Sequence, residues 1–190
     1  MSDNTDARPR GVVQKNRREV PEKILDATCG GRTIWHDESK DRDDTLYIDK
    51  REREPGFLGQ DGRTYSIDPD EIQDFRELPY ADGEFDLVVF DPPHKRLSNG
   101  MESLDGIMNK AYGALEAETW QRDIEAGFDE LFRVLKTGGT LVFKFANSDI
   151  PFQDVLDLAP VDPLFGTTTN NRKTTETRWF VFYKEADHAE

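Results

Sequence analysis

The stretch DLVVFDPPH, residues 86–94, constrains the fold more than any other part of the sequence. Two consecutive prolines cannot lie inside a sheet ladder or a helix, because each lacks an N–H group and has a fixed φ. The apolar run therefore predicts a buried strand that ends at Asp91 and continues into a rigid corner. The tip of this strand carries a carboxylate, a stiff backbone and an imidazole, from Asp91, Pro92, Pro93 and His94. We predict a catalytic site there.

Short apolar strands alternate with helical stretches over most of the chain. Strands are predicted within KILDATCGG, TLYIDKRE, LVVF, TLVFKFA and TRWFVFYK, and a short one near IQDF. Apolar residues at helical spacing predict a helix over residues 119–139, closed by Gly138 and Gly139, and a second helix over 151–159. This alternation predicts an α/β protein with an open, mostly parallel, Rossmann-like sheet and helices on both faces. Ligands bind such sheets at the carboxyl ends of the strands.

Three further segments fall at that edge. The turn DATCGGRT has consecutive glycines after a strand, which lets the backbone approach a ligand closely. The next strand ends at Asp49, 23 positions after Asp26, close to the spacing at which an acid binds the ribose of a nucleotide. Asp74 and Phe75 follow a short strand and could bind and stack on an adenine ring. Together they favour an adenosine-containing ligand without pyrophosphate, because no phosphate-binding loop is present.

The composition limits what else the chain can be. Its 190 residues, with 12 Phe and 3 Trp, suit one domain with a packed core. We expect a basic N-terminal arm at 1–21, one domain at 22–184 and a tail at 185–190. One Cys excludes a disulfide framework, and three scattered His predict no metal site. No apolar run is long enough to span a membrane. A cytoplasmic protein is therefore expected. The net charge of −14 gives either an ordinary acidic surface or a halophilic one, stabilised by KCl.

These motifs together resemble class I S-adenosylmethionine-dependent methyltransferases. DATCGGRT is similar to the DPFCGSGT turn of nucleic-acid amino-methyltransferases, DPPH to their Asp/Asn-Pro-Pro-aromatic motif, and FRVLKTGGTLVFKF to their helix, glycine turn and fifth strand. Small phage and prophage enzymes with FDPPH are the nearest look-alikes. The resemblance covers residues 22–184 and implies a seven-stranded sheet. One departure is Arg32, which replaces the third glycine and would stiffen the turn or reach another cofactor group.

The resemblance also implies a role for each motif. S-adenosylmethionine would be the cofactor, bound by Asp26, Ala27, Thr28, Cys29, Gly30, Asp49, Asp74 and Phe75. Asp91 and Pro92 would accept hydrogens from the target amine while it attacks the methyl group. His94 would stack on the target base, and Cys29 is expected to be a small buried residue of the turn.

The resemblance implies a nucleic-acid base as the methyl acceptor, with DNA slightly ahead of RNA. The chain has no evident target-recognition domain. An already exposed base or a partner subunit that recognises the target sequence is therefore expected, and the oligomeric state is left open. Two alternatives remain: a protein glutamine amide or small planar amine as acceptor, or a non-catalytic partner subunit with a methyltransferase fold.

Overall fold

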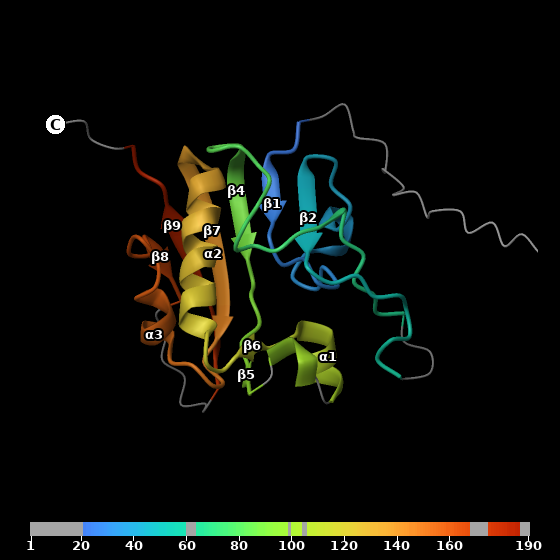
Figure 1. Ribbon diagram of the computed structural model, residues 1–190. Coiled ribbons are helices and arrows are strands. Elements are labelled where there is room, and N and C mark those ends of the chain that lie inside the picture. Colours follow the sequence, from blue (N-terminus) through green and yellow to red (C-terminus); the bar gives the residue numbers. More distant parts are fainter. Residues whose placement is uncertain (1–20, 60–63, 99, 104–105, 168–174, 187–190) are drawn as a thin grey trace, which may run out of the picture.

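The computed structural model describes residues 21–59, 64–98, 100–103, 106–167 and 175–186, and its centre is a seven-stranded sheet (Figure 1). The predicted arm, apart from its last residue, and most of the predicted tail lie outside the described residues. The strand order is β3-β2-β1-β4-β7-β9-β8. In this spatial order, adjacent strands from β3 through β2, β1 and β4 to β7 are parallel. β9 runs antiparallel to both β7 and β8. The predicted mostly parallel, seven-stranded α/β architecture is confirmed.

The strands of this sheet are mostly short. They are β1 (Ile24–Asp26), β2 (Thr45–Asp49), β3 (Glu71–Ile72), β4 (Phe85–Phe90), β7 (Leu135–Ala146), β8 (Phe165–Gly166) and β9 (Thr177–Tyr183). A separate two-stranded parallel sheet pairs β5 (Arg96–Leu97) with β6 (Leu115–Glu116), which the sequence pattern did not predict.

In the part of the chain that the structure describes, three α-helices and two 3₁₀ helices connect the strands. They are α1 (Ile107–Tyr112), α2 (Trp120–Val134), α3 (Phe152–Leu156), η1 (Asp37–Ser39) and η2 (Gly100–Ser103). The predicted helix over 119–139 ends earlier, at Val134, because β7 starts at the next residue and takes the two glycines into the strand. In the described ranges, no helix has both the length and the apolar character that a membrane span requires.

The aromatic core lies between the sheet and α2. Phe143 of β7 is fully buried, and its ring centroid lies 5.1 Å from that of Phe128 on α2 and 5.6 Å from that of Phe90 on β4. α3 packs on the same face, where Phe152 meets Phe180 of β9 at 5.6 Å. Burying several large aromatic side chains in one contiguous cluster provides most of the driving force for this layer.

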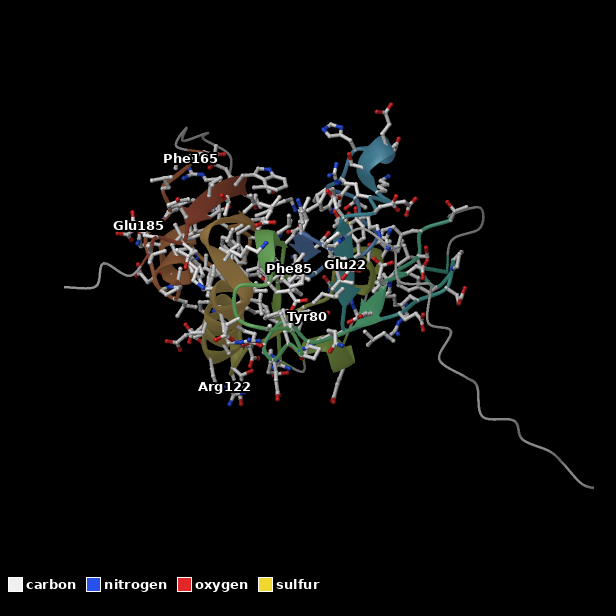
Figure 2. The ribbon with its side chains drawn as sticks, turned by 90° about the horizontal axis from the view of Figure 1, so that it is seen from above. Glu22, Tyr80, Phe85, Arg122, Phe165 and Glu185 are labelled. Atoms are coloured by element: carbon white, nitrogen blue, oxygen red, sulfur yellow. The ribbon has the colours of Figure 1, made fainter. Side chains whose placement is uncertain are left out.

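The opposite face of the sheet is covered in another way. Over β2, the loop that contains η1 packs on Tyr47: the Trp35 ring lies 5.4 Å away, the Arg32 guanidinium lies 3.9 Å from the ring centroid, and the Tyr47 hydroxyl donates to the Ser39 carbonyl. Viewed from above, α2 with Arg122 lies toward one side of the strands and the blue segment with η1 toward the other (Figure 2). The structure thus places helices α2 and α3 on one face and a structured loop on part of the other.

The strand order reverses between β1 and β4. From β1 the chain proceeds outward through β2 to β3, and later strands are added on the other side, beginning with β4. The loops that follow β1 and β4 therefore leave the sheet in opposite directions and open a crevice between them, where ligands bind in open α/β sheets. Both the glycine turn and the diproline corner begin at this position.

Gly127 allows α2 to approach the segment after β3. A Cβ at this position would lie 2.6 Å from Cδ2 of Phe75 and 3.3 Å from Cζ of Phe90. Gly127→Ala gains about 1 kcal/mol in helix propensity, but the overpacking costs more. We expect a net loss of about 1–2 kcal/mol in urea unfolding, whereas Glu125→Ala, on the exposed side of α2, stays within about 0.5 kcal/mol of wild type. Equal stability of the two variants would show that Phe75 can move without cost.

Candidate functional site

A cavity of about 940 Å³ opens at the carboxyl ends of the strands. Most of the residues predicted for the site line it, from both the glycine turn and the diproline corner. They are Ala27, Thr28, Cys29, Gly30, Asp49, Phe75, Asp91, Pro92, Pro93 and His94. Asp26 and Asp74, which were also predicted for the site, are not part of its lining. The topology thus brings most of the predicted residues together at one crevice.

Asp26 lies beneath the cavity and is completely buried. Its carboxylate accepts hydrogen bonds from the Trp35 indole at 2.6 Å and from the Thr28 backbone N–H at 3.2 Å. Burial raises the pKa of Asp26 to about 7, and the two hydrogen bonds oppose this increase only in part. Asp26 therefore supports the turn from below and titrates close to neutral pH.

The glycine turn is shaped by two residues with positive φ. Gly30 has φ of 48° and Arg32 has φ of 53°, which is uncommon for a residue with a side chain. The Arg32 side chain leaves the cavity, since it packs on Tyr47 and its Nη1 donates to the Lys40 carbonyl at 2.6 Å. Cys29 is buried, and burial raises the pKa of its thiol, as expected of a structural residue.

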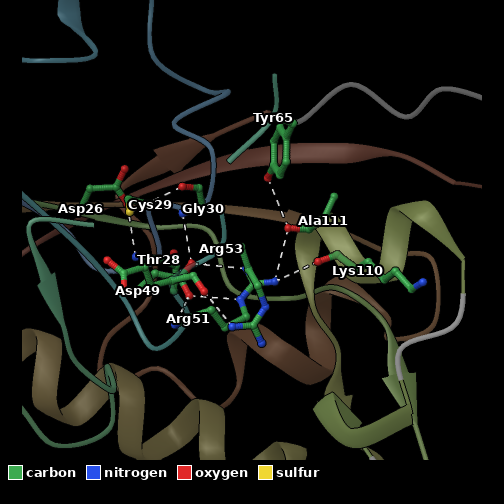
Figure 3. A network of polar contacts seen from close by, with 11 residues as sticks. Asp26, Thr28, Cys29, Gly30, Asp49, Arg51, Arg53, Tyr65, Lys110 and Ala111 are labelled. Atoms are coloured by element: carbon green, nitrogen blue, oxygen red, sulfur yellow. Dashed lines mark hydrogen bonds and ion pairs between the residues drawn. The ribbon is translucent and has the colours of Figure 1, made fainter. Parts of the chain in front are cut away.

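Asp49 at the end of β2 is bound on both carboxylate oxygens (Figure 3). Oδ2 accepts the Gly30 N–H at 3.1 Å, which joins the ends of β1 and β2. Oδ1 accepts the backbone N–H of Arg51 at 2.9 Å and its Nε at 3.1 Å. The two side chains are only 7% and 11% exposed, so this is a nearly buried ion pair.

Arg51 also joins the sheet edge to α1. Its Nη1 donates to the carbonyl oxygens of Lys110 and Ala111, both at 3.3 Å, and the Tyr65 hydroxyl donates to the Ala111 carbonyl at 3.2 Å (Figure 3). The Tyr65 ring lies so close to Gly31 that a Cβ there would be 2.3 Å from it. Gly31 therefore has no room for a side chain, and α1 is held over the cavity by two side chains from the β2–β3 segment.

Asp74 repeats the arrangement of Asp49. Its Oδ1 accepts the backbone N–H and the Nε of Arg76, its Oδ2 accepts Nη2 at 2.6 Å, and Arg76 also contacts Asp123 of α2 at 3.0 Å. Burial acts to raise the pKa of Asp74, but the hydrogen bonds from Arg76 outweigh it and the net shift is downward. Arg76 and Phe75 line the cavity in its place. Both strand ends thus use an Asp-x-Arg clamp.

The diproline corner carries a third carboxylate with a cationic partner. Lys144 of β7 places its Nζ 2.7 Å from Oδ2 and 3.0 Å from Oδ1 of Asp91, and the His94 Nε2 lies 2.9 Å from Oδ1. The Asp91 backbone N–H donates to the Thr28 hydroxyl at 2.9 Å, which connects the corner to the glycine turn. The ring edge contact between His94 and Phe145, with centroids 4.9 Å apart, fixes the imidazole.

Sequence reasoning missed four side chains that shape the cavity: Arg51, Tyr65, Arg76 and Lys144. The two arginines were visible as the shared pattern DKR and DFR after consecutive strands, and Lys144 as a charge inside the apolar strand LVFKFA. Tyr65 lies in an irregular loop and had no such signal. Among the described residues, no group of three or more His, Cys, Asp or Glu side chains is arranged to hold a metal ion.

No protein-family model and no curated protein sequence matches the chain. Solved structures do. A TehB-like SAM-dependent methyltransferase from Corynebacterium glutamicum matches at 20% identity and TM-score 0.50, over 87% of this chain and 81% of that one. The PH0226 protein from Pyrococcus horikoshii matches at 15% identity and TM-score 0.48 over 86% and 82%, and the putative methylase HI0767 from Haemophilus influenzae at 14% and 0.42 over 87% and 88%. The similarity to the Corynebacterium glutamicum structure shows that the chain has a Rossmann-like methyltransferase fold.

The shifted pKa of Asp26 predicts how stability depends on pH. Between the unfolded value of 3.8 and about 7 in the fold, the folded chain binds more protons than the unfolded chain, so this group's contribution falls as pH rises through that window. Paired carboxylates such as Asp74 act in the opposite direction at lower pH. We therefore compare urea unfolding of wild type with Asp26→Asn from pH 4 to 8. As pH rises from 4 to 8, the free energy of unfolding of wild type should fall by up to about 4 kcal/mol relative to that of the variant. Parallel profiles of the two proteins would contradict the raised pKa of Asp26.

The clamp on Asp49 predicts a local effect on α1. Arg51→Met leaves a nearly buried carboxylate without its cation and removes the bonds to the α1 carbonyls, which should cost about 3–5 kcal/mol. Amide hydrogen exchange should become faster in residues 107–112. The matched control is Arg53→Met, since Arg53 is exposed and donates to the Glu52 carbonyl. Unchanged exchange in α1 would show that Arg51 does not hold this helix.

Proposed function

We propose that this chain is a methyltransferase that uses S-adenosylmethionine to methylate an amino group of a nucleic-acid base, in DNA ahead of RNA. The observation that carries the proposal is the Thr28–Asp91 hydrogen bond, which places the glycine turn and the diproline corner on the same cavity. The fold shared with a SAM-dependent methyltransferase supports the choice of cofactor. DNA is favoured by the resemblance of the motifs.

The residues of the cavity fit this cofactor. Gly30 and Gly31 give a close backbone approach, Asp49 offers carboxylate oxygens to a ribose, and Phe75 forms an apolar wall for an adenine ring. Asp74 does not line the cavity and is engaged by Arg76, so we assign it a supporting role, with Arg76 on the cavity side. When bound, S-adenosylmethionine supplies a methyl group on a sulfonium centre.

The corner suits an amine that attacks in line. Asp91 and the Pro92 carbonyl are two acceptors at a fixed separation, so they orient the hydrogens of an incoming NH₂ group at little reorganisation cost. The nitrogen must lose one proton when its new bond to carbon forms. Asp91, hydrogen-bonded to His94, provides an acceptor for that proton, and the part of the His94 ring that lines the cavity can stack on a base.

The rim of the cavity favours an anionic substrate. Its exposed charged side chains are mostly cations, among them Lys50, Lys95 and Arg122, with Glu102 as an exposed acid, although the chain as a whole has a net charge of −14. Local cations contribute to phosphate binding even where the total charge is negative. Two apolar side chains of α1, Met108 and Tyr112, are 64% and 49% exposed and also line the cavity, where they could contact a base.

Substitution of Asp91 tests the proposal. Asp91→Asn should reduce methyl transfer about 10²–10³-fold while leaving cofactor affinity nearly unchanged, since the side chain is assigned to the target amine and not to the cofactor. The matched control is Asp86→Asn, because Asp86 at the start of the same strand forms a similar pair with Lys136 at 2.7 Å but is exposed. The assay follows labelled methyl from S-adenosylmethionine into DNA, RNA and cell protein, in molar KCl and in low salt.

The outcomes separate the hypotheses. Label in one nucleic-acid pool that is lost in Asp91→Asn and kept in Asp86→Asn supports the proposal. Label in protein alone would instead favour a glutamine amide as acceptor. Cofactor binding without transfer to any pool would favour the non-catalytic subunit, and a parallel loss of cofactor affinity in Asp91→Asn would contradict the role given to Asp91.

A further inference from the structure

Lys144 and Asp91 form a donor next to an acceptor inside the cavity. β4 and β7 pair with Phe90 opposite Phe143, so the next residues along each strand, Asp91 and Lys144, also come together. Both side chains line the cavity and are only 16% and 19% exposed. An ammonium group has three N–H donors, and the contacts with the two Asp91 oxygens account for two of them.

The position of Lys144 in the sheet is costly. Its side chain is only 19% exposed, on the face of the strand opposite to the buried Phe143 and Phe145, and an ammonium loses hydration there that its partner must replace. The pair of Asp86 and Lys136 joins the same two strands near their opposite ends, but its side chains are 49% and 43% exposed, as in an ordinary surface pair. The contrast points to a role for Lys144 toward a ligand of the cavity.

We propose that Lys144 determines acceptor specificity by donating a hydrogen bond to the acceptor atom beside the target nitrogen. This inference rests on the proposed function. The amino groups of adenine and cytosine lie next to an unprotonated ring nitrogen, so each base presents a donor beside an acceptor on one edge. Asp91 and Lys144 present the complementary acceptor and donor side by side. The target amine would donate to Asp91 and to the Pro92 carbonyl, while Lys144, on its flexible stem, turns to the ring nitrogen.

The same geometry disfavours other amines. An alkyl ammonium or a guanidinium has no acceptor atom for Lys144 and brings a second positive charge next to it, which is repulsive at low solvent exposure. The substrate class is therefore a neutral nitrogen in an N–C=N or N–C=O group, with base amino groups first. Lysine and arginine side chains are therefore disfavoured as acceptors.

The test combines a substitution in the protein with one in the substrate. Short single-stranded DNA carries adenine or 1-deazaadenine, and a second pair carries cytosine or 3-deazacytosine, so that only the ring nitrogen is replaced by C–H. For the base that is methylated, the deaza change should lower kcat/KM of wild type about 10- to 100-fold, as expected for one good base contact. Lys144→Met should be slower on the natural base and show no further loss on the deaza base.

Two variants control for structure and charge. Lys136→Met removes the exposed lysine of the same strand pair and should keep the full penalty of the deaza base. Lys144→Gln keeps an N–H donor without the charge and should keep part of the deaza penalty. Melting temperature and cofactor affinity of all variants show whether the fold and the cofactor site are retained. If Lys144→Met is too slow to assay, the dissociation constants of the same oligonucleotides give the same comparison.

The results distinguish the two proposals. An equal deaza penalty in wild type and Lys144→Met, with methylation of the natural base intact, overturns the role of Lys144 and leaves the proposed function standing. Wild type that binds the cofactor and methylates none of the nucleic acids overturns the proposed function, and this inference with it. A penalty present in wild type and absent only in Lys144→Met supports both.

Discussion

Parallel pairing of β1 with β4 is the interaction on which the cavity depends. The register that sets Asp26 opposite Val89 also brings the chain after β1 next to the chain after β4, because parallel strands end at the same edge. The bond from the Ala27 N–H to the Val89 carbonyl continues the ladder by one residue, and the Thr28 hydroxyl then accepts the Asp91 N–H. A single run of backbone pairing thereby fixes the distance between a loop suited to a cofactor and a corner suited to an attacking nitrogen. The aromatic layer under α2 stabilises this pairing from one face.

The carboxylates at this edge have two different kinds of partner. Asp49, Asp74 and Asp91 each have a cation within salt-bridge distance, from Arg51, Arg76 and Lys144. Asp26 is held by Trp35 and a backbone N–H, and its pKa rises to about 7 because burial is not balanced by a positive charge. In a chain that is already strongly acidic, a cation beside a partly buried carboxylate reduces the repulsion between neighbouring acids. The pattern explains why the arginines and the lysine follow the acids so closely in sequence or in register.

Much of this arrangement could be predicted from the sequence, for reasons that are local. The diproline ends a strand whatever surrounds it, consecutive glycines after a strand mark a close approach, and acids at strand ends must lie at one edge once the sheet is parallel. What could not be predicted depends on side-chain contacts and burial in the folded chain. The ion pair of Arg76 with both oxygens of Asp74 is one such contact, and the complete burial of Asp26, outside the cavity lining, is another such feature. The extent of β7 was also missed, because glycines that usually end a helix were taken into a strand.

The cationic partners also affect how a ligand can bind to each acid. A hydroxyl or amine that binds one of these carboxylates shares it with a guanidinium or ammonium already bound there, so the existing ion pair is weakened or moved when the ligand binds. At Asp49 the displaced group is Arg51, which also holds the carbonyls of Lys110 and Ala111. At Asp91 it is Lys144, whose stem can turn while its charge stays near the cavity. Occupation of the first acid would therefore loosen α1, and occupation of the second would redirect a donor toward the ligand. The built-in cations therefore make ligand binding at each acid depend on weakening an ion pair that is already formed.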